Sequence, residues 1–77
     1  MKSDKELFDL ARNYAHLESR FGLAATEEDI EDIKEDMEYI LSSLLKGGYD
    51  ANKFMKYKNM YKEMNIGEYL EFIKTLE

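Results

Sequence analysis

The placement of glycine, together with the absence of proline, constrains this chain most. The glycines occupy positions 22, 47, 48 and 67, and each falls where a helical pattern of apolar residues ends. Between them, apolar residues recur at steps of three and four, which is the spacing of one face of an α-helix. Alternation of apolar and polar residues never persists long enough to indicate a β-strand. The sequence therefore predicts an all-α protein.

The apolar stripes divide the chain into three main amphipathic helices and a short C-terminal helix. We expect these helices to span about 4–21, 27–46, 51–64 and 67–76. The stripe that contains Phe54 and Tyr57 would place Glu68 in the core if its helix continued, so the chain must break or bend within Asn65-Ile66-Gly67. We expect the four helices to pack as a small, compact helical bundle, a single domain over residues 1–77.

Length and composition exclude several classes of protein. A chain of 77 residues has a small core and marginal stability, for which association into a homodimer is a natural remedy. It has no cysteine, which excludes a disulfide framework and a thiolate metal site. No apolar run approaches the ~20 residues of a membrane span, and acidic residues interrupt the region where a signal peptide would be apolar. We therefore expect a cytoplasmic protein that does not enter a membrane.

The segment from Thr26 to Glu38 carries eight carboxylates and one lysine. In a helix, most of these acids lie opposite the apolar stripe, and two interpretations stay open. They form a solvated face that keeps the protein soluble, or they form a ridge that binds a basic partner. A special form of the second interpretation is a mimic of nucleic-acid phosphates that blocks a DNA- or RNA-binding protein. The candidate contact residues are Glu28, Glu31, Asp32, Glu35 and Glu38.

Three uncharged side chains are further candidates for partner contacts. Tyr39 projects near the middle of the acidic face, where it is a contact residue, a cover for a neighbouring helix, or simply exposed. Met55 and Met60 lie on either side of the main apolar stripe of 51–64, so this helix is apolar over a wide arc. Either a central position in the bundle or an adaptable exposed groove would explain that arc.

The sequence contains two groups of basic residues, one in the first helix and one in 51–64. Arg12, His16 and Arg20 recur at steps of four on the face of the first helix that we expect to point away from the core. This ridge could bind an anion, meet the acidic face of another copy, or be solvated. Lysines lie among the aromatic residues of 51–64, but a net charge of −6 argues against direct nucleic-acid binding.

No pattern in the sequence indicates catalysis, a cofactor or a metal. There is no cysteine nucleophile, no phosphate-binding glycine loop, and no spacing around the single histidine that would form a zinc or di-iron site. The expected function is therefore a non-enzymatic protein–protein interaction module, such as an adaptor, an inhibitor or a regulatory subunit. The alternative is the acidic nucleic-acid mimic.

Overall fold

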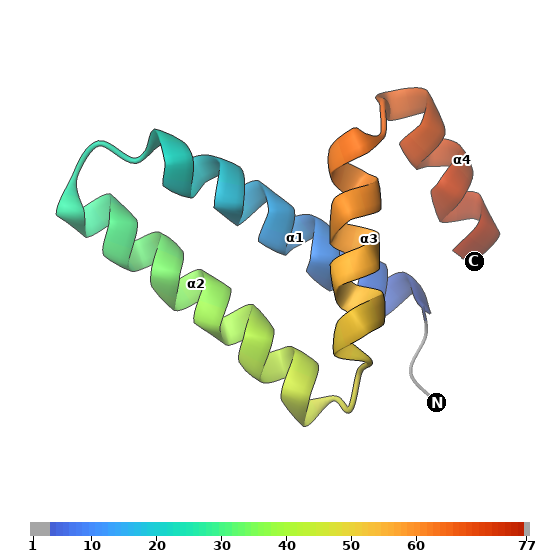
Figure 1. Cartoon of the computed structure of the whole chain (residues 1–77), viewed down its shortest axis with the longest axis horizontal. Coiled ribbons are helices and arrows are strands. Elements are labelled where there is room, and N and C mark those ends of the chain that lie inside the picture. The colour runs from blue at the N-terminus through green and yellow to red at the C-terminus, as the bar shows by residue number, and fades with distance from the viewer. Residues whose placement is uncertain (1–3, 77) are drawn as a thin grey trace.

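The computed structural model of the chain describes residues 4–76, and these form four α-helices without a strand (Figure 1). The helices are α1 (Asp4–Leu23), α2 (Glu27–Lys46), α3 (Ala51–Glu63) and α4 (Ile66–Leu76). The prediction of an all-α bundle with a short C-terminal helix is confirmed, with boundaries close to those expected. The ends of the predicted domain, 1–3 and 77, lie outside the described residues.

Side-chain caps explain where α2 and α3 begin. The Thr26 hydroxyl accepts a hydrogen bond from the backbone N–H of Asp29 at 3.1 Å, which satisfies one of the donors at the start of α2. The Asp50 carboxylate accepts bonds from the N–H groups of Asn52 and Lys53 at 2.8 and 3.3 Å. Both caps were within reach of sequence analysis, because Thr and Asp directly precede an amphipathic run.

The start of α4 depends on a reciprocal pair of hydrogen bonds. The Asn65 side-chain oxygen accepts from the Glu68 N–H at 2.9 Å, and the Glu68 carboxylate accepts from the Asn65 N–H at 3.4 Å. This is the geometry of a capping box, with asparagine in the place of serine or threonine. The predicted break after Asn65 therefore has a local cause as well as the change of apolar register.

Two consecutive glycines end α2 and redirect the chain into α3. The N–H of Gly48 bonds to the Leu45 carbonyl and that of Tyr49 to the Leu44 carbonyl, which together form a Schellman motif. Gly48 has φ of +69°, which a side chain would disfavour. Gly47 is required for a different reason, because the Tyr49 ring lies 2.6 Å from the position its Cβ would occupy.

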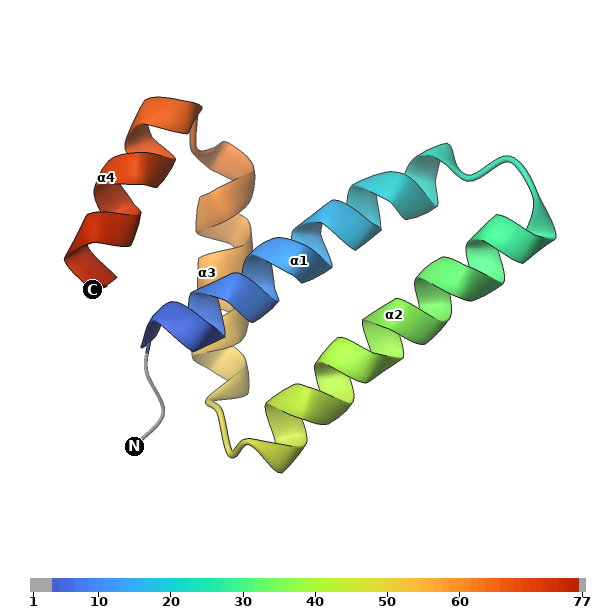
Figure 2. The ribbon, with the colours of Figure 1, turned by 180° about the vertical axis from the view of Figure 1, so that it is seen from behind.

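Helix α1 is the centre of the fold and makes the main contacts with each of the other helices. Helices α1 and α2 form an antiparallel hairpin, α3 crosses α1 on one side, and α4 runs back beside α3 (Figures 1 and 2). The core lies where α1 meets the others, and Phe8 is fully buried at its centre. The centre of the Phe8 ring lies 4.9 Å from the centre of the Phe72 ring in α4 and 5.5 Å from that of the Tyr57 ring in α3.

The fold is more open than the expected compact bundle. Its extents are 39 × 30 × 17 Å, and its radius of gyration is 13.2 Å, against about 11.5 Å for a compact domain of this length. The cause is that α3 crosses α1 instead of lying along the hairpin. The closed end of the hairpin, residues 16–23 and 27–38, therefore projects as a two-helix arm (Figure 1). We call these residues the arm.

Among the residues that the structure describes, no helix is both long enough and apolar enough to cross a membrane.

Candidate interaction surfaces

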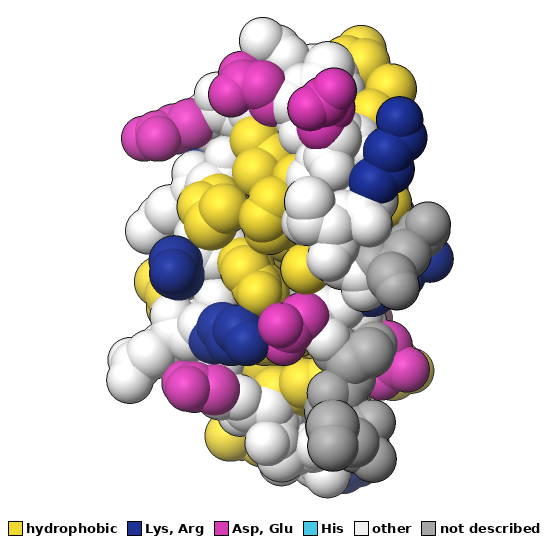
Figure 3. All heavy atoms as spheres, turned by 90° about the vertical axis from the view of Figure 1, so that its right-hand side faces the viewer, with side chains coloured by type: hydrophobic (Ala, Val, Ile, Leu, Met, Phe, Trp, Pro, Cys, Tyr) yellow, Lys and Arg dark blue, Asp and Glu magenta, His cyan; other side chains and the backbone are white. Residues whose placement is uncertain are grey.

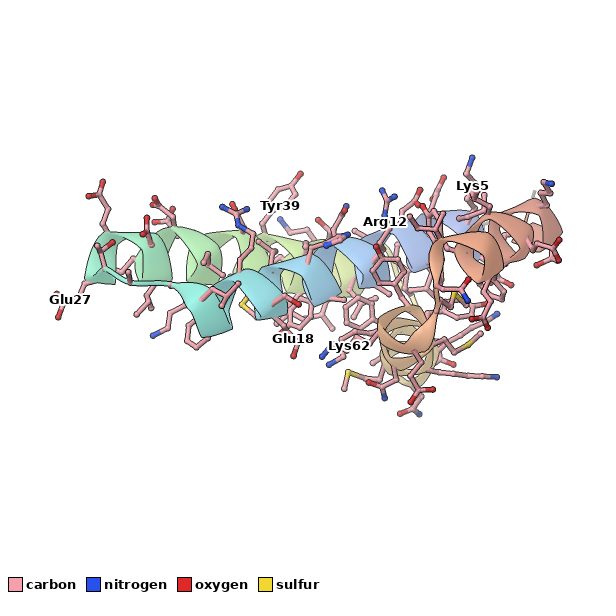
Figure 4. The ribbon with its side chains drawn as sticks, turned by 90° about the horizontal axis from the view of Figure 1, so that it is seen from above. Lys5, Arg12, Glu18, Glu27, Tyr39 and Lys62 are labelled. Carbon is pink, nitrogen blue, oxygen red and sulfur yellow. The ribbon has the colours of Figure 1, made fainter. Side chains whose placement is uncertain are left out.

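The hairpin of α1 and α2 has two sides that differ in what covers them. Helix α3 lies on one side, which we call the inner side, and the opposite side is the outer side. Figure 4 shows Tyr39 projecting from the outer side, whereas Glu18 and Lys62 lie on the inner side. The two sides differ in chemistry.

The outer side of α2 is acidic and exposed. The predicted contact residues all lie on exposed positions of this helix, namely Glu28, Glu31, Asp32, Glu35 and Glu38. Within residues 4–76, none of the eight carboxylates of α2 takes part in an ion pair or a side-chain hydrogen bond. Tyr39 lies among them with 73% of its surface exposed, so it does not cover a neighbouring helix. The structure thus brings these candidates onto one open face, and their role as contacts stays a prediction.

A hollow of about 330 Å³ lies between the two helices of the arm. Asp29, Asp32 and Asp36 line it from α2, and Arg20 lines it from α1. Arg20 is thus the basic side chain nearest to this part of the acidic surface. Across the described residues, no group of three or more histidine, cysteine or acidic side chains is arranged to hold a metal ion.

The inner side of α2 carries an apolar row of three residues at steps of four. Leu41 and Leu45 have exposed fractions of 39% and 77%, whereas Met37 is half-buried and also packs against the core. This row lies about 100° around α2 from the row of Ile40 and Leu44, which is buried against α1. By their spacing alone, Leu41 and Leu45 belong to the apolar stripe of this helix, and the sequence predicts them in the core. That prediction is wrong, because no helix of the described chain covers this flank of α2.

Two further apolar side chains lie on the same side. Phe21 follows Glu18 by three residues and is therefore on the inner side of α1, with 41% of its surface exposed. Met55 precedes Lys58 by three residues and Lys62 by seven, so it faces the arm from α3 and is 47% exposed. We call Phe21, Met37, Leu41, Leu45 and Met55 the inner apolar face.

An ion-pair cluster fixes the angle between the arm and α3. The Glu18 carboxylate lies 3.3 Å from the ammonium group of Lys58 and 3.0 Å from that of Lys62. Burial alone would raise the pKa of Glu18, but the two ammonium groups outweigh it and hold the pKa below its ordinary value. Lys58 is buried, and its ammonium group lies 5.5 Å from the centre of the Tyr14 ring. Its charge is therefore compensated inside the fold.

The two predicted methionine candidates separate in the structure. Met55 belongs to the inner apolar face, whereas Met60 is half-buried and packs against the hydrophobic core. A central position of α3 therefore accounts for Met60, and an open surface accounts for Met55. Helix α3 is apolar over a wide arc because it contacts α1 and also faces the arm.

The predicted outward ridge of Arg12, His16 and Arg20 is wrong for Arg12, which is half-buried, whereas His16 and Arg20 are exposed. Arg12 Nη1 donates a hydrogen bond to the Tyr69 hydroxyl at 2.6 Å, and His16 Nε2 is hydrogen-bonded to the Tyr61 hydroxyl at 2.8 Å. The physical reason is that α3 and α4 bring tyrosine hydroxyl groups to this flank of α1. The sequence offered a weak signal, since a tyrosine in an apolar stripe needs a polar partner for its hydroxyl.

No protein-family model, no curated protein and no solved structure matches this chain. The features that bear on its function are therefore the exposed acids of α2 and the inner apolar face.

Proposed function

We propose that this chain is a non-enzymatic interaction module that binds a basic protein through the outer side of α2. The observation that carries the proposal is that the exposed carboxylates of α2 have no cationic partner within the described residues, and that the large ring among them, Tyr39, is exposed. Such a face attracts a basic surface over a long range, and the tyrosine supplies a rigid contact once the two surfaces meet.

The single lysine of this stretch lies at one edge of the acidic surface. Lys34 is one turn from both Glu31 and Glu38. Glu28, Asp32 and Glu35 have no lysine or arginine at that spacing, so most of the acidic surface carries a single sign of charge. Like charges at steps of four also cost a few tenths of a kcal/mol per pair.

The same observation favours a more specific second candidate, a mimic of nucleic acid. The acids of α2 lie within residues 27–38, the first 12 of its 20 residues, which corresponds to a length of about 18 Å. A row of negative charge on a rigid helix could occupy a basic groove that otherwise holds DNA or RNA phosphates. This candidate predicts that the partner itself binds nucleic acid and that nucleic acid displaces the chain from it.

The test compares two variants with the same loss of charge. Glu31→Gln with Glu35→Gln removes two acids from the ridge, and Glu63→Gln with Glu71→Gln removes two exposed acids from α3 and α4. Proteins from an extract would be captured on the immobilised parent chain and on each variant. The expected result is a protein retained by the parent and the control variant and lost from the ridge variant.

Salt dependence and competition then separate the two candidates. The captured protein is titrated with the chain at increasing salt, in the presence and absence of a DNA or RNA duplex. Steep weakening with salt together with displacement by the duplex supports the mimic. Binding that no duplex displaces supports an ordinary basic partner. Equal capture by the parent and the ridge variant would mean that the acids are only a solvated face.

A further inference from the structure

The accessible surface of the chain is larger than its mass requires. It measures 5627 Å², whereas a compact monomer of 9.1 kDa exposes about 4,900 Å². The excess of about 700 Å² is close to the ~800 Å² that each partner buries in a stable protein–protein interface. The chain therefore exposes about as much additional surface as one interface would cover.

Exposed apolar side chains from three helices lie in one corner of the molecule. The inner apolar face contains Phe21, Leu41, Leu45 and Met55 among the exposed large hydrophobic residues, and the hairpin and α3 border it on two sides. Apolar side chains contributed by three helices to one side of a protein mark an interface far more often than scattered exposed leucines do.

The charges at the two ends of this corner are complementary. The closed end of the arm is the acidic part of the chain, where α2 begins with Glu27, Glu28 and Asp29. The helix at the other end, α3, has four lysines and a single acid within Ala51–Glu63. Asp4 pairs with Lys53, and Glu18 is shared by Lys58 and Lys62, so a smaller positive charge that includes Lys56 is left to meet a partner. One molecule cannot bring these ends together, because the arm points away from α3 (Figure 1). Two molecules turned head to tail can do so.

We propose that the occupant of the inner apolar face is a second copy of this chain. The two hairpins pack inner side to inner side about a two-fold axis, and they run antiparallel. The arm of each copy then fills the corner between the hairpin and α3 of the other, with its acidic end against the basic α3. The contact is isologous, so it closes at two copies. It leaves the outer side of α2 open in both copies and does not depend on the function proposed above.

A second apolar surface lies at the opposite end of the molecule and provides a matched control. Figure 3 shows hydrophobic side chains gathered at the end where α4 lies, and α4 exposes Ile66 at 79% and Leu70 at 54%. These fractions match or exceed those of Leu45 and Leu41. Glutamine at either pair removes two exposed apolar side chains at little cost in helix propensity.

The first experiment is sedimentation equilibrium of the whole chain from micromolar to hundreds of micromolar concentrations. The parent chain and Ile66→Gln with Leu70→Gln are expected to give twice the chain mass. Leu41→Gln with Leu45→Gln is expected to raise the dimer dissociation constant at least tenfold, while circular dichroism shows unchanged helix content. A parent chain that stays monomeric throughout overturns the proposal, and so does a dimer that only the α4 variant dissociates.

The second experiment tests the orientation on a chain with an intact inner face. The sequence has no cysteine, so Ala25→Cys places one spin label at the exposed closed end of each arm. Antiparallel arms hold the two labels more than about 20 Å apart, since about 15 residues of α2 separate the arm end from α3. Parallel arms would place the labels about 10 Å apart, the spacing of packed helices. A short distance therefore overturns the antiparallel dimer even if the glutamine variant fails to fold.

Discussion

The two ends of α1 lie in different environments. At its first half, α1 is enclosed by α3 and α4, with Phe8 in contact with aromatic rings from both. Toward its C-terminal end, α1 contacts α3 only as far as Glu18, and its last turn has only α2 beside it (Figure 1). Leu17 and Ile33 are the buried residues nearest to that end. The enclosed region therefore supplies most of the stability, and the region toward the closed end of the hairpin supplies the open surface. Variants in the two regions should therefore have separable effects.

The largest expected effect is on the enclosed half of α1. Phe8→Ala removes a fully buried ring from the centre of the core and should lower the free energy of unfolding by about 3–5 kcal/mol. A domain of this size has few kcal/mol to lose, so we expect a largely unfolded chain at 25 °C. Urea denaturation followed by circular dichroism measures the change. A loss no larger than that from Leu41→Ala on the open surface would contradict the division into two regions.

Glu18→Gln tests the junction between the two regions. The variant keeps a hydrogen-bond acceptor but leaves the buried Lys58 without a carboxylate, and we expect a loss of about 1–2 kcal/mol at pH 7. Because folding lowers the pKa of Glu18, its stabilisation is present above the ordinary value of 4.5 and is lost as pH falls through the folded value. Denaturation curves should therefore differ between parent and variant at pH 7 and converge in acid. A difference independent of pH would mean that the ion pair does not stabilise the fold.

Gly48→Ala changes the turn that sends α3 across α1. An alanine at φ of +69° is strained, and we expect a loss of about 1 kcal/mol with the helix content retained. Thermal denaturation measures the loss, and Gly22→Ala provides the control, since no atom lies within 4 Å of the position that its Cβ would take. Equal effects of the two substitutions would show that the left-handed turn does not matter for stability.

The smallest expected effect has the opposite sign and concerns the open region. Glu31→Gln with Glu35→Gln relieves repulsion between carboxylates one turn apart and should raise stability by a few tenths of a kcal/mol at low salt. The increase should disappear at high salt, where the repulsion is screened. Urea denaturation at two salt concentrations tests it. A clear loss of stability would show that these acids have a structural role on the surface.

The sequence was sufficient to predict the helices and their ends. Periodicity located the four stripes, and the glycine pair marked a boundary that the structure reproduces. Thr26 and Asp50 are of the residue types that cap helices, and both act as caps in the structure. These features are local, because a cap or a stripe depends on residues within one or two turns. The Asn65 and Glu68 pair could also have been recognised, since it has the spacing of a capping box.

The sequence was not sufficient to predict which element covers each stripe. The row of Leu41 and Leu45 has the same periodicity as a buried row, and nothing within α2 shows whether a helix of its own chain lies over it. The contact of Arg12 with Tyr69 joins residues 57 positions apart and depends on where α4 returns. The acidic face was predicted more reliably, because charged positions on an amphipathic helix almost always face outward.

The attachment of α4 has a consequence for the kinetics of hydrogen exchange. None of its side chains is fully buried, and Arg12 and the ring of Phe8 are among its principal attachments to α1. Opening of this helix alone therefore costs less free energy than unfolding of the hairpin and α3. In deuterated buffer its amides should exchange before those at the centre of α1. Each opening exposes part of the Phe8 ring to solvent. The opening rate of α4 therefore determines how often the aromatic core becomes hydrated.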